Sequence, residues 1–235
     1  MKIRAKRTKI FKEGQSLSDF VLENIGKLKE GSVVVVTSKI VAMAEKRTVP
    51  IGEIKKEKLI KKESQFAYHG KYAWLTFREG MLVASAGIDE SNARGKYVLL
   101  PKDSFKTAKN LRSFLMSKYK LRKLGVIITD SRNNPLRAGA VGVAISYAGF
   151  KGLRKYSGTP DIFGRLFHFS RANIADSLAA SAVLVMGEGD QRKPVAVIEE
   201  APIEFVDKVL KNELMIKPKD DMYLPFLSKL LKRKI

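Results

Sequence analysis

Two aspartates stand directly after apolar stretches of the chain, and their positions point to chemistry. Asp89 lies in the run VASAGIDESN (residues 83–92), and Asp130 ends the run LGVIITD. Each run is typical of a buried strand, so each carboxylate should lie at a strand end beside glycine or serine. A carboxylate in apolar surroundings needs a charged partner. A divalent metal ion carrying a polyphosphate is the sharpest candidate, because Mg²⁺ and Mn²⁺ take oxygen ligands and use few protein groups.

The same acidic residues also have a purely structural interpretation. Aspartate caps turns and helices very often, and spacing alone slightly favours that role for both Asp89 and Asp130. Glu188, in the run MGEG, follows a predicted helix, where its charge opposes the helix dipole; such a cost sometimes marks a functional site. Lys39, after the run VVVVTS, could reach a phosphate, although an ordinary surface lysine is the simpler interpretation.

Composition limits the chemistry further. The chain has 235 residues with 45% hydrophobic content, enough for a full core, and we expect one domain over residues 1–235 or two intimately packed parts. The absence of cysteine excludes disulfides and thiolate chemistry and agrees with a reducing cytoplasm. Only two histidines argue against a multi-histidine metal centre.

Charge and hydropathy indicate where the protein works and what it meets. The N-terminus lacks the apolar core of a signal peptide, and no apolar run reaches the roughly 18–20 residues that span a bilayer, so we expect a soluble, cytoplasmic protein without membrane contact. The net charge of +21 attracts anions, and nucleotides, phosphorylated metabolites, RNA and acidic lipids all qualify. The basic tail at residues 224–235 is expected to dock as a terminal helix.

The periodicity of apolar residues predicts the elements that must position these side chains. Strands and helices intermix without a regular βαβ repeat, so we predict an α+β fold with mixed or antiparallel sheets. In the first half of the chain we expect a strand and short helix (31–46), a solvated helix or loop (55–63), a hairpin turning at Glu79 and Gly80 (72–87) and a helix capped by Ser104 (103–120). In the second half we expect a strand (125–129), a closely packed Gly/Ala-rich segment (137–152), a helix (172–189) and a strand (194–200).

Five motifs, taken in order, resemble those of the coenzyme F-420 γ-glutamyl ligase family. They are GIDESN (87–92), IITDS (127–131), PLRAGAVGVAISYAG (135–149), GTPDIFGR (158–165) and ADSLAASAVLVMGEG (175–189), followed by PVAVI. Each motif is weak by itself, but their order is specific. The chain is therefore identified as a divergent member of this family.

The resemblance implies an enzyme that uses GTP and a divalent metal, Mg²⁺ or Mn²⁺, to join L-glutamate to a carboxylate of a deazaflavin coenzyme precursor through an acyl phosphate. It also implies an intertwined homodimer. Asp89 and Asp130 would bind metal, and Ser131 with Glu188 would complete a second metal position. The nucleotide pocket would be lined by Thr8, Lys9, Ile10, Phe11, Ser38, Lys39 and Asn92.

The chain also departs from the family pattern. Met43 stands where the family usually has a nucleotide-contacting lysine, and we hypothesise that Lys39 compensates for it. Arg192 and Lys193 crowd a loop in which the family usually keeps a glycine. The region 50–66 is shorter than the helical stretch that the family usually has there. Two alternatives therefore stay open. One is a folate γ-glutamate ligase, and the other is a decayed enzyme whose charge serves RNA or another polyanion.

Overall fold

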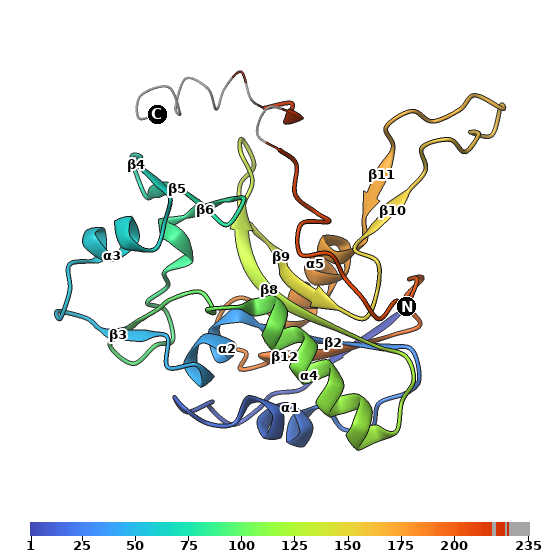
Figure 1. Ribbon diagram of the computed structural model, residues 1–235. Helices are drawn as coiled ribbons and strands as arrows, with labels where there is room; N and C mark the ends of the chain where they lie inside the picture. Colours follow the sequence, from blue (N-terminus) through green and yellow to red (C-terminus); the bar gives the residue numbers. More distant parts are fainter. Residues whose placement is uncertain (218–219, 224, 226–235) are drawn as a thin grey trace.

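A mixed five-stranded sheet forms the centre of the computed structural model, which describes residues 1–217, 220–223 and 225 (Figure 1). The strand order is β1 (Lys2–Ala5), β12 (Val195–Glu199), β2 (Ser32–Thr37), β8 (Leu124–Asn133) and β9 (Ala140–Ala148). Only the β2–β8 pair in this sheet is parallel. The predicted α+β class with mixed sheets is confirmed.

Strand β2 is apolar over its four central valines because helices cover both of its faces. Val34 and Val36 face a layer of three helices, α1 (Leu17–Ile25), α2 (Ser38–Ala44) and α4 (Ser104–Tyr119). Val33 and Val35 face α5 (Ile174–Met186). All four valines are fully buried, and each contributes roughly 1.5–3 kcal/mol through burial. The continuous apolar run is thus the signature of a strand buried on both faces.

A smaller group of elements lies beside the sheet. Its members are β3 (Thr48–Pro50), α3 (Lys56–Lys62), β4 (Phe66–His69), β5 (Trp74–Arg78), β6 (Met81–Ala84), the short 3₁₀ turn η1 (Ser85–Gly87) and β7 (Lys96–Val98). Strands β4, β5 and β6 form an antiparallel sheet, and β3 pairs with β7. Helix α3 buries Leu59 and Ile60, so the charged run at 55–63 is only partly solvated.

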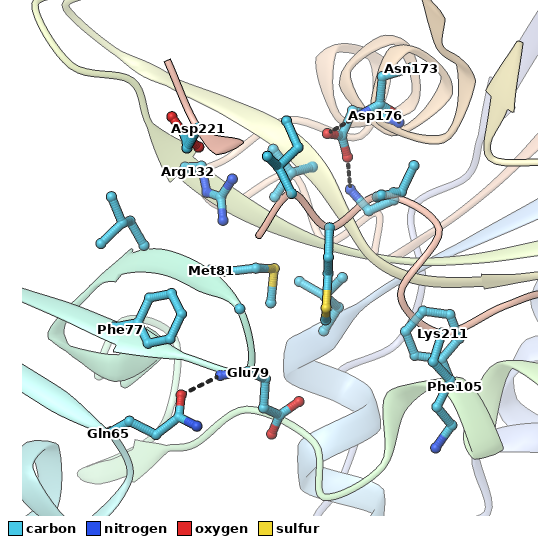
Figure 2. Close-up of a pocket in the computed structure, with 18 of the residues that line it drawn as sticks. Gln65, Phe77, Glu79, Met81, Phe105, Arg132, Asn173, Asp176, Lys211 and Asp221 are labelled. Atoms are coloured by element: carbon cyan, nitrogen blue, oxygen red, sulfur yellow. Dashed lines mark hydrogen bonds between the residues drawn. The ribbon is translucent and has the colours of Figure 1, made fainter. Parts of the chain in front are cut away.

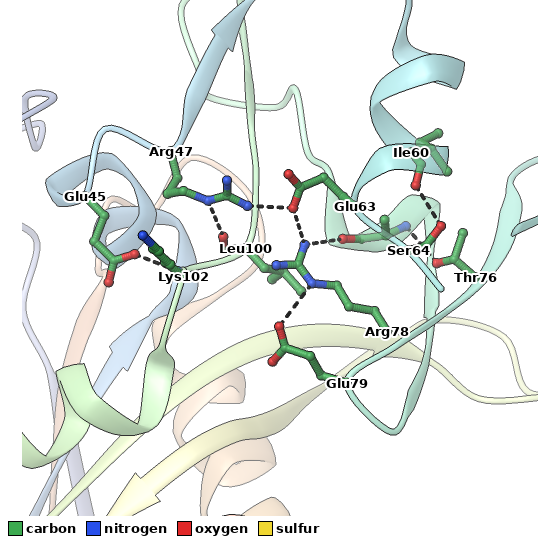
Figure 3. A network of polar contacts seen from close by, with 11 residues as sticks. Glu45, Arg47, Ile60, Glu63, Ser64, Thr76, Arg78, Glu79, Leu100 and Lys102 are labelled. Atoms are coloured by element: carbon green, nitrogen blue, oxygen red, sulfur yellow. Dashed lines mark hydrogen bonds and ion pairs between the residues drawn. The ribbon is translucent and has the colours of Figure 1, made fainter. Parts of the chain in front are cut away.

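A carboxylate shared by two arginines ties this group together (Figure 3). Glu63, at the C-terminal end of α3, accepts from Arg47 at 2.6 Å and from Arg78 at 3.0 Å. Arg47 precedes β3, whereas Arg78 ends β5. The ion pairs therefore fix a helix end to two separate strands.

A long hairpin arm projects away from the central sheet (Figure 1). Strands β10 (Leu153–Lys155) and β11 (Arg171–Asn173) form its base. Backbone bonds continue outward, from Gly158 to Phe167 at 2.8 Å and from Phe167 to Thr159 at 2.9 Å. Large apolar side chains nevertheless stay exposed on the arm, including Ile162 at 91% and Phe163 at 89%.

Most predicted elements are found, with one wrong cap. The hairpin turns at Glu79 and Gly80, and α5 ends at Met186 with Gly187 as its C-cap. Ser104 is the first residue of α4 rather than its cap, because the Asp103 side chain accepts from the Lys106 N–H at 3.0 Å. No helix in the described ranges is long and apolar enough to cross a membrane. The predicted terminal helix at 224–235 falls, apart from residue 225, outside the described residues.

The Gly/Ala-rich segment predicted at 137–152 packs closely from Gly142 onward, whereas residues 137–141 are exposed. Gly142 in β9 lies against α5, where a Cβ atom would come within 2.4 Å of a Val183 methyl group. A larger residue at this position would force helix and sheet apart.

Candidate functional site

The site is built where the parallel pairing of β2 with β8 ends, at the end of β2 and within β8. Thr37 and Thr129 are register partners, so the residues that follow them emerge at the same edge of the sheet. Ser38 starts α2, and its hydroxyl donates to Asp130 Oδ1 at 2.9 Å. Carboxyl ends of parallel strands are where open sheets commonly bind ligands.

One cavity of about 1000 Å³ opens at this edge, and it brings together every residue that the sequence predicted for metal or nucleotide binding. These are Thr8, Lys9, Ile10, Phe11, Ser38, Lys39, Asp89, Asn92, Asp130, Ser131 and Glu188. They come from separate parts of the chain that only the fold unites. Their individual roles stay predictions.

Asp89 is held on both sides of its carboxylate. Its Oδ1 accepts from the Ser91 N–H at 2.7 Å, so the Asp89 side chain does cap a turn. Its Oδ2 lies 2.7 Å from Lys39 Nζ, which points into the same cavity. Desolvation raises the pKa of the Asp89 carboxyl, but the Lys39 ammonium and the Ser91 N–H outweigh it, and the net pKa is lowered. Asp89 thus combines a turn cap with an ion pair.

Asp130 has the opposite electrostatics. Desolvation raises the pKa of its carboxyl to about 6, although the hydrogen bond from Ser38 opposes the shift. The negative charge of Asp89 also raises this pKa. The charge of Asp89 thus disfavours ionisation of Asp130, and a cation bound at these carboxylates would offset that effect.

Ser131 and Glu188 form a second oxygen pair. Successive residues of β8 point to opposite faces, so Ser131 projects toward α5 while Asp130 projects toward α2. The Ser131 hydroxyl donates to Glu188 Oε2 at 2.7 Å. Within the described ranges, no three acidic or histidine side chains gather as a cage for a metal ion. Carboxylate and hydroxyl pairs fit Mg²⁺ or Mn²⁺, which keep most of their ligands from water and phosphate.

The residues predicted to line the nucleotide pocket differ in their solvent exposure. Thr8 is buried, and its N–H donates to the Arg192 carbonyl at 2.8 Å. Phe11 belongs to the core, where its ring packs edge-on against Phe20 at 4.9 Å. Ile10, in contrast, is exposed. Thus this segment borders the cavity while also closing the core.

The loops on either side of the cavity contact each other. The Asn92 side-chain amide donates to the Gly189 carbonyl at 3.3 Å, and Asn92 itself has a positive φ of 54°. Met43 also lines the cavity, so the departure from the family pattern is located at the site.

Several lining residues were not predicted from sequence. They make the rim more basic than acidic: Arg7, Lys12, Arg94, Lys96, Arg192 and Lys193 against Glu13 and Asp190. Arg192 and Lys193 had been noted as departures from the family pattern. For the other residues the net charge of the chain was the only signal, and net charge does not show where the charges lie. The rim favours a strongly anionic ligand.

Oxygen pairs surrounded by basic side chains define a cavity suited to a polyphosphate and a hard cation. The sequence model of the family described as "F420-0:Gamma-glutamyl ligase" matches residues 6–73 and 58–200, and the chain belongs to this family.

Individual relatives agree with this assignment. A protein of Methanococcus maripaludis strain C6 named "Coenzyme F420:L-glutamate ligase" is 38% identical over 146 residues, covering 62% of this chain and 58% of that protein. Proteins with the same name from Methanocaldococcus jannaschii and Methanopyrus kandleri are 38% identical over 144 residues and 32% identical over 209 residues. The first covers 61% of this chain and 57% of the relative, and the second covers 78% and 80%. The chain thus spans less than two thirds of the first relatives' length.

Proposed function

We propose that the protein is a nucleotide- and metal-dependent ligase that joins L-glutamate to a carboxylate of a deazaflavin coenzyme precursor. The observation that carries the proposal is the convergence of all family-predicted residues on one cavity with a basic rim. Family membership and the names of the relatives support the reaction class. GTP is the proposed phosphoryl donor.

Asp89 and Asp130 are the proposed ligands of one divalent cation, and Ser131 with Glu188 would hold a second. When bound, Mg²⁺ or Mn²⁺ supplies positive charge that neutralises the phosphates. Lys39 now pairs with Asp89 at 2.7 Å, so it occupies the place that a cation would take. Loss of that ion pair would leave its ammonium available to the nucleotide phosphates, and this would offset the methionine at position 43.

The proposed reaction needs no protein nucleophile. An acceptor carboxylate oxygen attacks the γ-phosphorus of GTP, which releases GDP and gives an acyl phosphate. The amino group of L-glutamate then attacks the acyl carbon, phosphate leaves, and the nitrogen loses a proton as the amide forms. The protein contributes positioning and charge stabilisation, the main sources of catalysis in phosphoryl transfer.

A glutamylation assay tests this function. The purified chain would be incubated with Mn²⁺, GTP, labelled L-glutamate and the deazaflavin precursor, and product would be followed by mass spectrometry. We expect product only in the complete mixture, with one phosphate released per amide.

The Lys39→Ala variant should bind GTP about tenfold more weakly, the loss expected for one charge-assisted hydrogen bond. Exposed Lys61 provides the control, as Lys61→Ala.

The same assay separates the alternatives. Turnover of folate instead of the deazaflavin precursor would make the protein a folate ligase. Turnover of neither, with RNA binding that weakens steeply as salt increases, would favour the decayed polyanion binder.

We also propose that the protein works as a homodimer. The support is the projecting arm, which keeps large apolar side chains exposed on a hydrogen-bonded scaffold. Exposed apolar patches of this kind mark interaction surfaces, and a second copy of the chain is the proposed occupant.

A further inference from the structure

Figure 2 shows a second cavity, of about 590 Å³. Its lining residue Arg132 directly follows Ser131, which lines the first cavity. The walls of the second cavity come from the β4–β6 sheet, from β9 and the start of α5, and from the C-terminal segment. Apolar side chains such as Phe77, Met81 and Ile145 dominate its lining. Glu213 anchors the C-terminal wall, because it accepts from the Tyr147 hydroxyl at 2.5 Å and from the Gly152 N–H at 2.9 Å.

Most charged groups on these walls already have partners. Asp176 accepts from the Ala144 N–H at 2.8 Å and from the Asn173 side chain at 2.7 Å. Lys211 pairs with Asp103 at 3.2 Å, outside the cavity. Both side chains therefore already have polar partners within the protein.

Arg132 is different. Its Nε and Nη2 atoms are buried, and neither has a hydrogen-bond partner within the part of the chain that the structure describes. In Figure 2 the guanidinium extends into the space above Met81 and Phe77. The nearby Asp221 carboxylate instead accepts from the Tyr223 N–H at 2.7 Å. Arg132 thus presents a cation to a mainly apolar cavity.

Two buried guanidinium nitrogens without partners among the described residues need an explanation. Each buried donor without a partner costs roughly 1–3 kcal/mol, and more when it is charged. The planar fork of arginine matches the two oxygens of a carboxylate or phosphate better than any other side chain. The apolar lining around it suits a flat, weakly polar body. The cavity therefore fits a ligand that joins such a body to an anionic group.

The position of Arg132 links this cavity to the first one. Arg132 follows Asp130 by two residues in β8, so both project from the same face, about 6.6 Å apart along the strand. The two cavities are therefore lined by neighbouring residues of one strand, Asp130 and Ser131 in the first and Arg132 in the second.

We propose that the second cavity holds the acceptor, with its aromatic body against Phe77 and Met81 and an anionic group, carboxylate or phosphate, on Arg132. This inference rests on the proposed ligase function. Arg132 would select acceptors that carry the anion, while Phe77 would contribute affinity to any flat ring.

Matched ring compounds test the proposal directly. Riboflavin, flavin mononucleotide and 10-carboxymethylflavin share one ring system and carry no anion, a phosphate and a carboxylate, respectively. Binding to the full chain, with Mn²⁺ and GDP present, would be measured by quenching of flavin fluorescence. We expect at least one anionic flavin to bind at least tenfold more tightly than riboflavin, and the preferred anion identifies the group that Arg132 takes.

The variants assign this preference to the residue. Arg132→Gln should abolish the preference, Arg132→Lys should keep only part of it because the fork is lost, and Phe77→Ala should weaken all three ligands alike. Arg122→Gln, in the exposed turn before β8, is the control and should change nothing. Unfolding midpoints would confirm that each variant is folded.

Several results would overturn the inference. They are equal binding of all three flavins, no flavin binding at all, an unchanged preference in both Arg132 variants, or an Arg132→Gln effect on oligomeric state alone. Turnover of the deazaflavin precursor with an unchanged acceptor KM in Arg132→Gln would reject this site while the ligase function stands. An Arg132-dependent preference without turnover of any acceptor would reject the ligase function but keep an anion-selective ring site.

Discussion

Asp130 is the residue at which stability and the proposed chemistry conflict. Its carboxyl has a pKa raised to about 6 by desolvation, so at neutral pH it is ionised in surroundings that disfavour the charge. The nearby charge of Asp89 adds to this cost. A site that destabilises the metal-free protein is prepared to gain free energy when a cation binds.

The Asp130→Asn variant should reveal this cost. Because the folded pKa lies above the unfolded value of 3.8, the folded state binds more protons, and stability falls as pH rises from about 4 to about 6. Asparagine does not ionise and can still accept from Ser38. Near pH 7 the metal-free variant should therefore be more stable than wild type, by at most about 3 kcal/mol. Near pH 3.5 the two should converge, as measured by thermal unfolding across the pH range.

Metal binding provides the complementary measurement. Mn²⁺ should raise the unfolding midpoint of wild type but have little effect on Asp130→Asn. The control is Asp190→Asn, an exposed acid on the rim of the same cavity, which should behave like wild type. If the stability of wild type and of Asp130→Asn depended on pH in the same way, ionised Asp130 would not destabilise the fold.

At the scale of elements, local patterns predicted well and long-range pairing did not. The apolar run of β2, the turn at Gly80 and the helix end at Gly187 all have local signals that the structure confirms. The contact between Ser38 and Asp130 joins residues 92 positions apart, and it depends on the parallel pairing of β2 with β8. No spacing rule predicts such a contact. The motif order grouped these residues, but only the fold gives the group a geometry.

The bulge between β8 and β9 is a second feature without a sequence signal. The register shifts between Ile128 and Thr129, which leaves Ile145 unpaired on β9. The shift falls directly before Asp130, and Ile145 lines the second cavity. Bulges change the direction of side chains beside functional sites. The bulge thus lies between Asp130, which lines the first cavity, and Ile145, which lines the second.

The Glu63 ion pairs yield a prediction about how the smaller group of elements is held. Glu63→Ala would leave the Arg47 and Arg78 guanidiniums without their shared carboxylate, and both arginines are largely buried. Losing one partner of a buried ion pair costs about 3 kcal/mol or more. We expect a clear drop in the midpoint of urea unfolding.

Glu57→Ala is the matched control. Glu57 belongs to the same helix, but its pair with Lys61 is exposed, with side-chain exposures of 54% and 57%. Its removal should leave the midpoint unchanged, because exposed pairs contribute little. Similar effects of the two substitutions would mean that the shared carboxylate does not hold the group in place.

For the whole molecule, the arm predicts the oligomeric state. If a second copy covers the arm, Phe163→Asp should place a charge in that interface and shift the protein toward monomer in sedimentation velocity experiments. Leu136→Asp, on the exposed turn between β8 and β9, introduces the same charge away from the arm and should leave the state unchanged. A monomeric wild type at micromolar concentration would contradict the homodimer.

The strand order of the central sheet also has a consequence during synthesis. Both neighbours of β2 come much later in the chain, since β8 begins at Leu124 and β12 at Val195. A nascent chain therefore carries a continuous run of four valines with no sheet partner for many residues of elongation. Non-local pairing of this kind slows folding and exposes strand edges to misassociation. The same β2–β8 pairing that forms the cavity is thus formed late in synthesis. Until then, the exposed valine run of β2 needs protection from association with other chains.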